Sequence, residues 1–286
     1  AHQSMADDGT LQAVVASLQS VRTRVEAAST QVTAVNELAA CSIAAEASSA
    51  AAPAIQPAPE VARVPTPLAC LGSKPGDGAT LIAVSKLKPS SYVRAAYEAG
   101  HRHFGENYVQ ELVAKARELP GDIAWHFIGH LQTNKVKELV SVPNLLCVHT
   151  VDSLKLAAEL QKRAAQVRPS RPLAVMVQVN TSAEESKSGC TSTDVAALCV
   201  EIEEACPALA LSGLMCIGKY SADDGCAEAD FETLAQCRQA AARALELEPG
   251  TLALSMGMSH DFEAAIRAGA THVRVGSTIF GARKPK

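Results

Sequence analysis

The sequence predicts an α/β protein that folds as a (β/α)8 TIM-type barrel with an additional N-terminal helix. Three observations lead to this prediction. The chain has 286 residues, and (β/α)8 barrels of about 250 residues fold as single domains. From residue 80 onward, short apolar runs alternate with amphipathic helical runs, a pattern typical of a parallel sheet. Eight apolar runs occur, which is the number that closes such a barrel.

An open, doubly wound sheet is the alternative architecture for alternating strands and helices. In that fold a G-x-G-x-x-G motif typically follows the first strand, and none follows residues 81–84 here. We therefore expect residues 1–286 to form a single barrel domain.

The N-terminal region precedes the barrel and has two parts. Residues 11–38 carry apolar side chains at helical spacing, which predicts an outer helix. Residues 41–79 are rich in Ala, Pro, Ser and Gly and lack this periodicity, so we expect a flexible insertion there. A proline-rich segment that binds a partner protein is the alternative interpretation of this insertion.

The barrel elements follow in order, with Gly or Pro at many of the joints. The expected strands are 81–84, 102–105, 125–128, 145–148, 173–179, 209–216, 252–255 and 272–275. The expected helices are 90–99, 107–118, 153–166, 191–205, 227–245 and 259–268.

The composition argues against several classes of protein. A formal net charge of −4 gives no electrostatic reason to expect nucleic acid. No apolar run approaches the roughly 20 residues that a membrane helix needs. Nine cysteines without a C-x-x-C pair are typical of reduced core thiols, so we expect a cytoplasmic location, with an organelle left open. His126, His130 and Asp152 lack the spacing of a metal site, so we expect no metal.

The residues that carry chemistry fall at the carboxyl ends of the expected strands, where barrel active sites lie. Lys86 follows the first strand in "LIAVSKLKP". The loops after the last two strands, "SMGMSHD" and "RVGSTIFG", bring glycines, serine hydroxyls and helix starts, which together favour a phosphate. A lysine amine opposite a phosphate site indicates a phosphorylated carbonyl compound held as a Schiff base, and Arg274 adds positive charge.

The motifs "AVSKLKP", "HFGENYVQE", "WHFIGHLQTNK", "HTVDS", "VNTSAEESKSG", "GLMCIG" and "SMGMSHDFEAAIRAGATHVRVGSTIFGAR" resemble the pyridoxal phosphate homeostasis protein family over residues 80–283. The resemblance implies a barrel like the N-terminal domain of alanine racemase, with pyridoxal 5′-phosphate on Lys86. It implies that Arg274 faces the pyridine nitrogen and that Asn107 lies near the cofactor. The phosphate contacts that it implies come from Ser255, Met256, Gly257, Ser259, Gly276 and Ser277. The family usually has a polar residue where this chain has Leu87, and its link before the first strand is shorter than 41–79.

We expect a cofactor-holding protein without catalytic residues, one that takes part in intracellular vitamin B6 homeostasis. An arginine only donates hydrogen bonds, so Arg274 favours an unprotonated pyridine nitrogen and weakens the electron sink that catalysis needs. About ten residues follow the last strand, so we expect no second domain with a second base. A pyridoxal-phosphate-dependent amino-acid racemase is the alternative, and a Schiff-base aldolase acting on a phosphosugar is a more distant one.

The remaining polar residues and the partners leave alternatives open. His126 and His130 are either acid–base groups or residues that shape the barrel mouth. Glu184, Glu185 and Lys187 form either a solvated loop or a lid. We expect Trp125, Cys190 and Cys216 to be core residues. The expected partners are pyridoxal phosphate and recipient apoenzymes that use it, and the expected state is a monomer.

Overall fold

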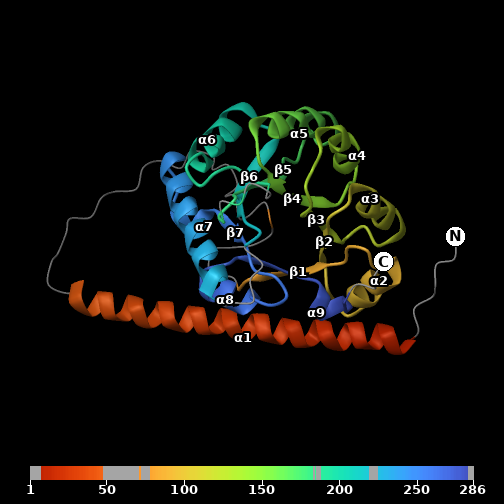
Figure 1. Ribbon diagram of the computed structural model, residues 1–286, viewed down its shortest axis with the longest axis horizontal. Helices are drawn as coiled ribbons and strands as arrows, with labels where there is room; N and C mark the ends of the chain where they lie inside the picture. Colours follow the sequence, from red (N-terminus) through yellow and green to blue (C-terminus); the bar gives the residue numbers. More distant parts are fainter. Residues whose placement is uncertain are drawn as a thin grey trace.

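Eight parallel strands form a closed barrel in which neighbours in the sequence are neighbours in the sheet and β1 pairs with β8 (Figure 1). A computed structural model describes residues 8–47, 71, 78–182, 184, 188–218 and 225–282, with side chains for these except 35–47, 225, 226 and 249. The strands are β1 (Thr80–Val84), β2 (His103–Glu106), β3 (Ala124–Phe127), β4 (Leu145–Val151), β5 (Leu173–Gln178), β6 (Leu209–Met215), β7 (Ala253–Ser255) and β8 (His272–Val275). The predicted barrel is confirmed, and each strand lies within three residues of its expected bounds.

Helices surround the barrel and connect the strands (Figure 1). They are α1 (Asp8–Ala47), α2 (Ser90–Glu98), α3 (Val109–Glu118), α4 (Val136–Val140), α5 (Leu154–Val167), α6 (Val195–Ala205), α7 (Gly225–Ala244), α8 (Phe262–Arg267) and α9 (Ser277–Phe280), with 3-10 turns η2 (Thr133–Lys135) and η3 (Pro249–Thr251). The sequence pattern did not predict α4, α9 or the two 3-10 turns. Each has five residues or fewer, too few for a helical period to show.

The main hydrophobic core lies between the barrel and its helices. Strand residues that point outward, such as Phe104, Trp125 and Val175, pack there against the apolar faces of the helices. Because side chains alternate along a strand, the intervening residues point into the barrel. That interior contains a small apolar cluster with Cys147 and Met176, together with buried polar residues that prove important for the site.

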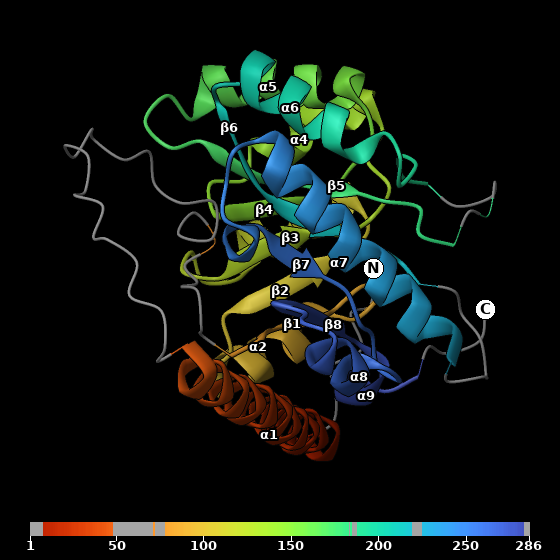
Figure 2. The same ribbon diagram turned by 90° about the vertical axis from the view of Figure 1, so that its left-hand side faces the viewer.

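Helix α1 packs across one side of the barrel against α2, α8 and α9 (Figure 2). Its buried stripe of Val14, Leu18, Val21 and Val25 matches the predicted outer helix. A bidentate ion pair between Arg24 and Glu263, with both N–O distances 2.8 Å, joins α1 to α8.

Residues 41–79 differ from the predicted flexible insertion in two places. Helix α1 continues to Ala47, because alanine-rich sequence has high helix propensity even without an apolar stripe. Leu71 is buried and packs inside the barrel against Cys147 and Met215 rather than being exposed. Residues 48–70 and 72–77 lie outside the described residues, so the expected flexibility of the insertion stays a prediction.

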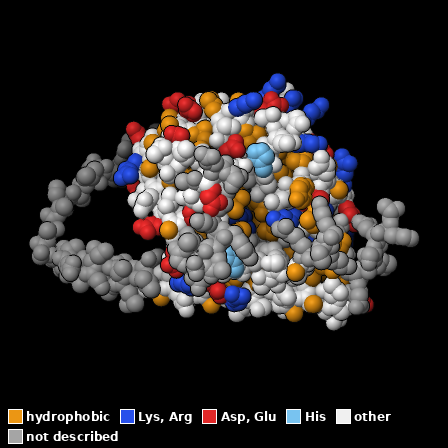
Figure 3. Space-filling view, viewed as in Figure 1, with side chains coloured by type: hydrophobic (Ala, Val, Ile, Leu, Met, Phe, Trp, Pro, Cys, Tyr) orange, Lys and Arg blue, Asp and Glu red, His pale blue; other side chains and the backbone are white. Residues whose placement is uncertain are grey.

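The outer surface mixes charges of both signs. Lys and Arg side chains are interspersed with Asp and Glu over the helices on the face shown in Figure 3, without one continuous basic surface. None of the helices within the described ranges combines the length and apolar character that crossing a bilayer requires.

Candidate functional site

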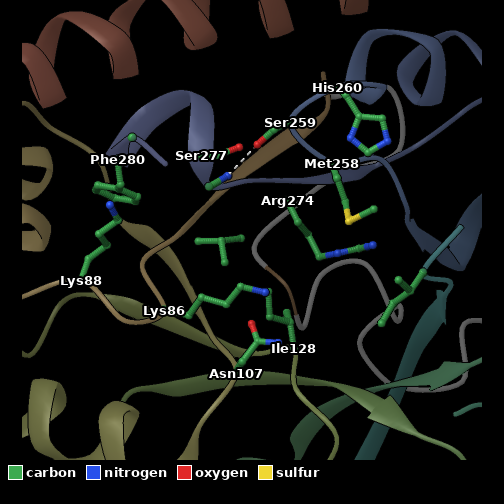
Figure 4. A pocket seen from close by; sticks show the side chains of 14 residues that line it. Lys86, Lys88, Asn107, Ile128, Met258, Ser259, His260, Arg274, Ser277 and Phe280 are labelled. Carbon is green, nitrogen blue, oxygen red and sulfur yellow. Dashed lines mark hydrogen bonds between the residues drawn. The ribbon is translucent and has the colours of Figure 1, made fainter. Parts of the chain in front are cut away.

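A cavity of about 330 Å³ lies at the carboxyl ends of the strands. Its walls come from the ends of β1 and β8, from the loops that follow β1, β2, β3, β6, β7 and β8, and from α9 (Figure 4). The lining residues are Val84, Lys86, Lys88, Asn107, Ile128, Ile217, Met258, Ser259, His260, Arg274, Gly276, Ser277, Phe280 and Gly281.

Six of the nine residues predicted to bind the cofactor line this one cavity, namely Lys86, Asn107, Ser259, Arg274, Gly276 and Ser277. Lys86 extends into the cavity toward Asn107, and Arg274 lies across from them (Figure 4). The Ser259 hydroxyl accepts a hydrogen bond from the Gly276 N–H at 3.2 Å, which ties the loop after β7 to the loop after β8. The structure thus brings together residues that are up to 191 positions apart (86 to 277).

Three predicted residues, Ser255, Met256 and Gly257, lie behind the cavity rather than in its lining. Ser255 and Met256 are fully buried. The N–H of Met256 donates to the carbonyl of His272 at 3.1 Å, so it serves the pairing of β7 with β8. In this structure these residues support the loop that carries Met258 and Ser259.

Gly257 has a packing role that its place in the motif did not reveal. Its φ is +88°, a backbone conformation that strongly favours glycine. A Cβ atom at this position would lie 2.5 Å from the Cβ of Ala265 and 3.1 Å from the Cα of Phe262, both in α8. The absent side chain therefore makes room for α8, whereas the sequence-based interpretation assigned that room to a ligand.

Arg274 reaches the cavity from a fully buried position in β8 and is held by neutral groups. Its guanidinium donates to the Ser255 hydroxyl and to the Cys216 carbonyl, each at 2.8 Å. Burial lowers the Arg274 pKa from its ordinary value, but an arginine stays charged at physiological pH. The site therefore has a fixed positive charge at this wall.

A chain of histidines continues from Ser255 through the barrel interior. Ser255 Oγ lies 3.0 Å from His149 Nδ1, His149 Nε2 lies 2.9 Å from His126 Nδ1, and His126 Nε2 lies 3.1 Å from His103 Nδ1. Burial lowers the pKa of His126 and His149 well below its ordinary value, so these rings are neutral. Because Arg274 can only donate to Ser255, the Ser255 hydroxyl is free to donate to His149 Nδ1, and the rings then donate in sequence through Nε2.

The other candidates from the sequence lie away from the cavity lining. His126 belongs to the buried histidine chain, and His130 is exposed with Nδ1 3.3 Å from the Ser188 hydroxyl. Trp125 is buried, as expected of a core residue. Cys216 is buried as expected, whereas Cys190 is only partly buried. Burial raises the pKa of both thiols to about 12, which keeps both protonated. Glu185 and Lys187 lie outside the described residues, so the proposed lid stays a prediction.

Eight lining residues were not predicted, namely Val84, Lys88, Ile128, Ile217, Met258, His260, Phe280 and Gly281. All eight lie inside the quoted motifs, so their position beside predicted residues was the available signal. For the apolar residues the type of side chain added nothing, because an isoleucine at a strand end cannot be distinguished by sequence from a core isoleucine.

The lining has the chemistry to hold an aromatic phosphate such as pyridoxal phosphate. Five apolar side chains can cover a ring. Lys86, Lys88 and Arg274 are cationic, and the described lining residues include no Asp or Glu, so the cavity favours an anion. The buried Oδ1 of Asn107 has no hydrogen-bond partner among the described residues. A buried polar atom without a partner is costly, and a bound polar ligand can supply one.

Comparisons with known proteins agree with this chemistry. Residues 70–284 match the family model of the alanine racemase N-terminal domain. The pyridoxal phosphate homeostasis protein of Mus musculus is 46% identical over 209 residues, which cover 71% of this chain and 76% of the relative. The protein of that name from Pseudomonas aeruginosa is 45% identical over 204 residues, covering 71% and 84%. The solved structure of PipY from Synechococcus elongatus PCC7942 with PLP bound is 37% identical, with a TM-score of 0.60 and coverage of 71% and 92%.

Proposed function

Because the chain belongs to the pyridoxal phosphate homeostasis protein family, we propose that it binds pyridoxal 5′-phosphate and holds it covalently through Lys86 in vitamin B6 homeostasis. One observation carries the assignment of the site. Lys86, Arg274 and the Ser259 and Ser277 side chains meet on a single cavity whose described lining has no carboxylate. Together these residues offer one small ligand both a reactive amine and a site for an anionic group.

Each group has a separate task in this proposal. Bound pyridoxal phosphate supplies an aldehyde, which condenses with a lysine amine to form a Schiff base with loss of one water. Lys86 supplies the amine from the loop after β1. Ser259 and Ser277 offer hydroxyl donors for the phosphate, and hydrogen bonds to a charged acceptor are stronger than those between neutral groups. Ile128 and Ile217 exclude water from the ring faces.

We propose that the protein holds its cofactor without turnover. Arg274 is a donor only, and no carboxylate among the described lining residues could favour a protonated pyridine nitrogen. Both features weaken the electron sink on which pyridoxal enzymes depend. Formation of D-alanine from L-alanine by the purified protein, lost in Lys86→Ala, would contradict this part of the proposal.

The setting of this function is also a proposal. We propose transfer of the cofactor to recipient apoenzymes by a cytoplasmic monomer. The six cysteines whose side chains the structure describes are free thiols, which supports a reducing compartment. Light scattering at the mass of one chain, 29.8 kDa, tests the monomer. Reactivation of an apoenzyme by the loaded protein tests the transfer.

Borohydride reduction tests the site directly. Reduction after incubation with pyridoxal phosphate should fix one adduct on Lys86 in the wild type, detected by peptide mass spectrometry. Lys86→Ala should lose the adduct. Lys88→Ala, which removes the other lysine in the described lining, is the matched control and should keep it. An adduct on Lys88 or another lysine of the wild type would show that the assignment of Lys86 is wrong.

A further inference from the structure

A buried ionic cluster lies directly beneath the loop that carries Lys86. It consists of Ser85, Glu106, Glu111 and Lys115, and we call it the Lys115 cluster. The Lys115 ammonium donates to Glu106 Oε1 at 2.7 Å, to the Ser85 carbonyl at 2.8 Å and to Glu111 Oε2 at 3.3 Å. The Ser85 hydroxyl donates to the same Glu106 oxygen at 2.7 Å. All three donors of the ammonium are therefore used.

The cluster holds the backbone on both sides of Lys86. The peptide group before Lys86 is fixed through its carbonyl, that of Ser85, which accepts from Lys115. The peptide group after Lys86 is fixed through its N–H, that of Leu87, which donates to Glu111 Oε2 at 2.8 Å. Hydrogen bonds to charged groups are stronger than those between neutral groups. Two charged side chains of α3 thus hold the backbone around Lys86, together with the turn bond from the Lys88 N–H to the Ser85 carbonyl at 3.1 Å.

The backbone needs such support, because it is in an unfavourable conformation next to Lys86. Leu87 has a φ of +59°, in the left-handed region that non-glycine residues rarely adopt. Its side chain is 54% exposed, so packing contributes little to holding it there. A residue held in this region persists only where the surrounding structure fixes it. Here the bonds from Lys115 and to Glu111 add to the turn bond between Lys88 and Ser85 in supplying that constraint.

Stability alone is a weak explanation for the Lys115 cluster. Glu106 and Lys115 are almost completely buried, and a buried ion pair is often no more stabilising than apolar residues of similar volume. Burial raises the Glu106 pKa to about 7, although Lys115 and Ser85 act against the shift. The second oxygen of Glu106 is buried without a partner among the described residues. Burying these charged groups costs free energy that the ion pair does not fully offset. We therefore explain the cluster by the backbone segment that it holds in place.

We propose that Lys115 and Glu111, supported by Glu106, are positioning residues that set the Lys86 amine for reaction in the cavity. The proposal rests on the proposed function, since it concerns covalent attachment at Lys86. None of the three lines the cavity, so they act through the backbone of Lys86 and make no contact with the ligand. The cluster therefore affects how fast Lys86 reacts, whereas the lining residues determine how tightly the ligand binds.

Separate measurements of attachment and binding test this proposal. The rate of attachment is followed by the absorbance change on mixing apoprotein with pyridoxal phosphate. Binding alone is measured with 4′-deoxypyridoxine 5′-phosphate, which lacks the aldehyde. Glu111→Ala should slow attachment at least tenfold and leave the dissociation constant of the analogue within twofold. Glu111→Gln keeps an oxygen that can accept from Leu87, so it should restore most of the rate.

The chain offers a matched control on another outer helix. Glu159 and Arg163 of α5 form an ion pair at the same i,i+4 spacing, and Glu159 is as exposed as Glu111, 26% against 27%. Glu159→Ala should leave attachment and analogue binding unchanged. Lys115→Met leaves a buried Glu106 unpaired and can unfold the protein, so the double variant Lys115→Met with Glu106→Gln is used instead. It should also slow attachment at least tenfold.

The outcomes separate this proposal from the proposed function. Wild-type attachment on Lys86 with an unimpaired rate in Glu111→Ala and in the double variant would overturn the positioning role alone. A parallel loss of attachment and analogue binding would also overturn it, because it would show a purely structural role. The absence of an adduct on Lys86 in the wild type would overturn the proposed function, and the positioning role with it.

Discussion

The substitution Gly257→Ala tests whether close packing against α8 holds the loop after β7 in place. Two penalties apply to this substitution. The φ of +88° places an alanine in the left-handed region, at about 1–2 kcal/mol. The new Cβ would lie 2.5 Å from that of Ala265, and such overpacking costs typically about 1–3 kcal/mol because a short, rigid side chain cannot move aside. Together these predict a loss of about 2–5 kcal/mol in the free energy of unfolding.

A second glycine separates the conformational penalty from the steric one. Gly269 has a φ of +93°, and a Cβ there would meet no atom within 4 Å. Gly269→Ala should therefore show only the conformational penalty, about 1–2 kcal/mol. Urea unfolding of both variants measures the difference between them. We expect Gly257→Ala to be the less stable by about 1–3 kcal/mol.

The ligand readout decides between the two interpretations of Gly257. The Gly257 carbonyl accepts from the Arg274 N–H at 3.0 Å, and the next residue, Met258, lines the cavity. A shift of this loop away from α8 should thus weaken pyridoxal phosphate retention in Gly257→Ala together with stability. Equal stability of the Gly257 and Gly269 variants would refute the packing argument. Lost retention at full stability would instead favour the direct approach of a ligand.

Three further predictions follow from the structure. Stability should fall as the pH drops from about 6.5 toward 3, since burial lowers the pKa of His101 and His272 to about 3 and their stabilising contribution, present above 6.5, is lost on protonation. The raised Glu106 pKa of about 7 acts in the opposite direction between about 4.5 and 7. It is one group against five, because burial also lowers the pKa of His103, His126 and His149. Urea unfolding that showed equal or greater stability at pH 4 than at pH 7 would contradict the prediction. Ser255→Ala should lower stability by about 1–3 kcal/mol, because it removes the acceptor of the Arg274 bond, and unchanged thermal unfolding would contradict it. Unphosphorylated pyridoxal should bind at least tenfold more weakly than pyridoxal phosphate in equilibrium dialysis, and equal retention would remove the phosphate site from the proposal.

The sequence alone determined the barrel and the order of its units. Strand and helix patterns depend on spacing over four to twelve residues, and that information is local. Parallel strands joined by helices place all of their carboxyl ends on one face. Lys86, Asn107 and Arg274 could therefore be assigned to one site before any contact was known.

Short or unpatterned segments were harder to predict. Helix α9 has four residues, less than two turns, so no periodicity marks it. The extension of α1 to Ala47 follows from alanine propensity without an apolar stripe. Leu71 ends the short apolar run 68–71, which follows two prolines and has no strand or helix period, and only the barrel interior explains its burial.

The tertiary structure decided which residues of each motif face the ligand and which support it. Ser255 and Ser259 are serines of one motif, yet Ser255 points into the barrel toward Arg274 and Ser259 lines the cavity. The sequence determined that lysine, arginine and serine gather at one end of a parallel barrel. Only the structure showed Lys115 buried under Lys86, because a lysine on an amphipathic helix is normally solvated. The physical reason is that burial and hydrogen-bond partners depend on contacts between residues distant in sequence, whereas strand and helix periods depend on neighbours.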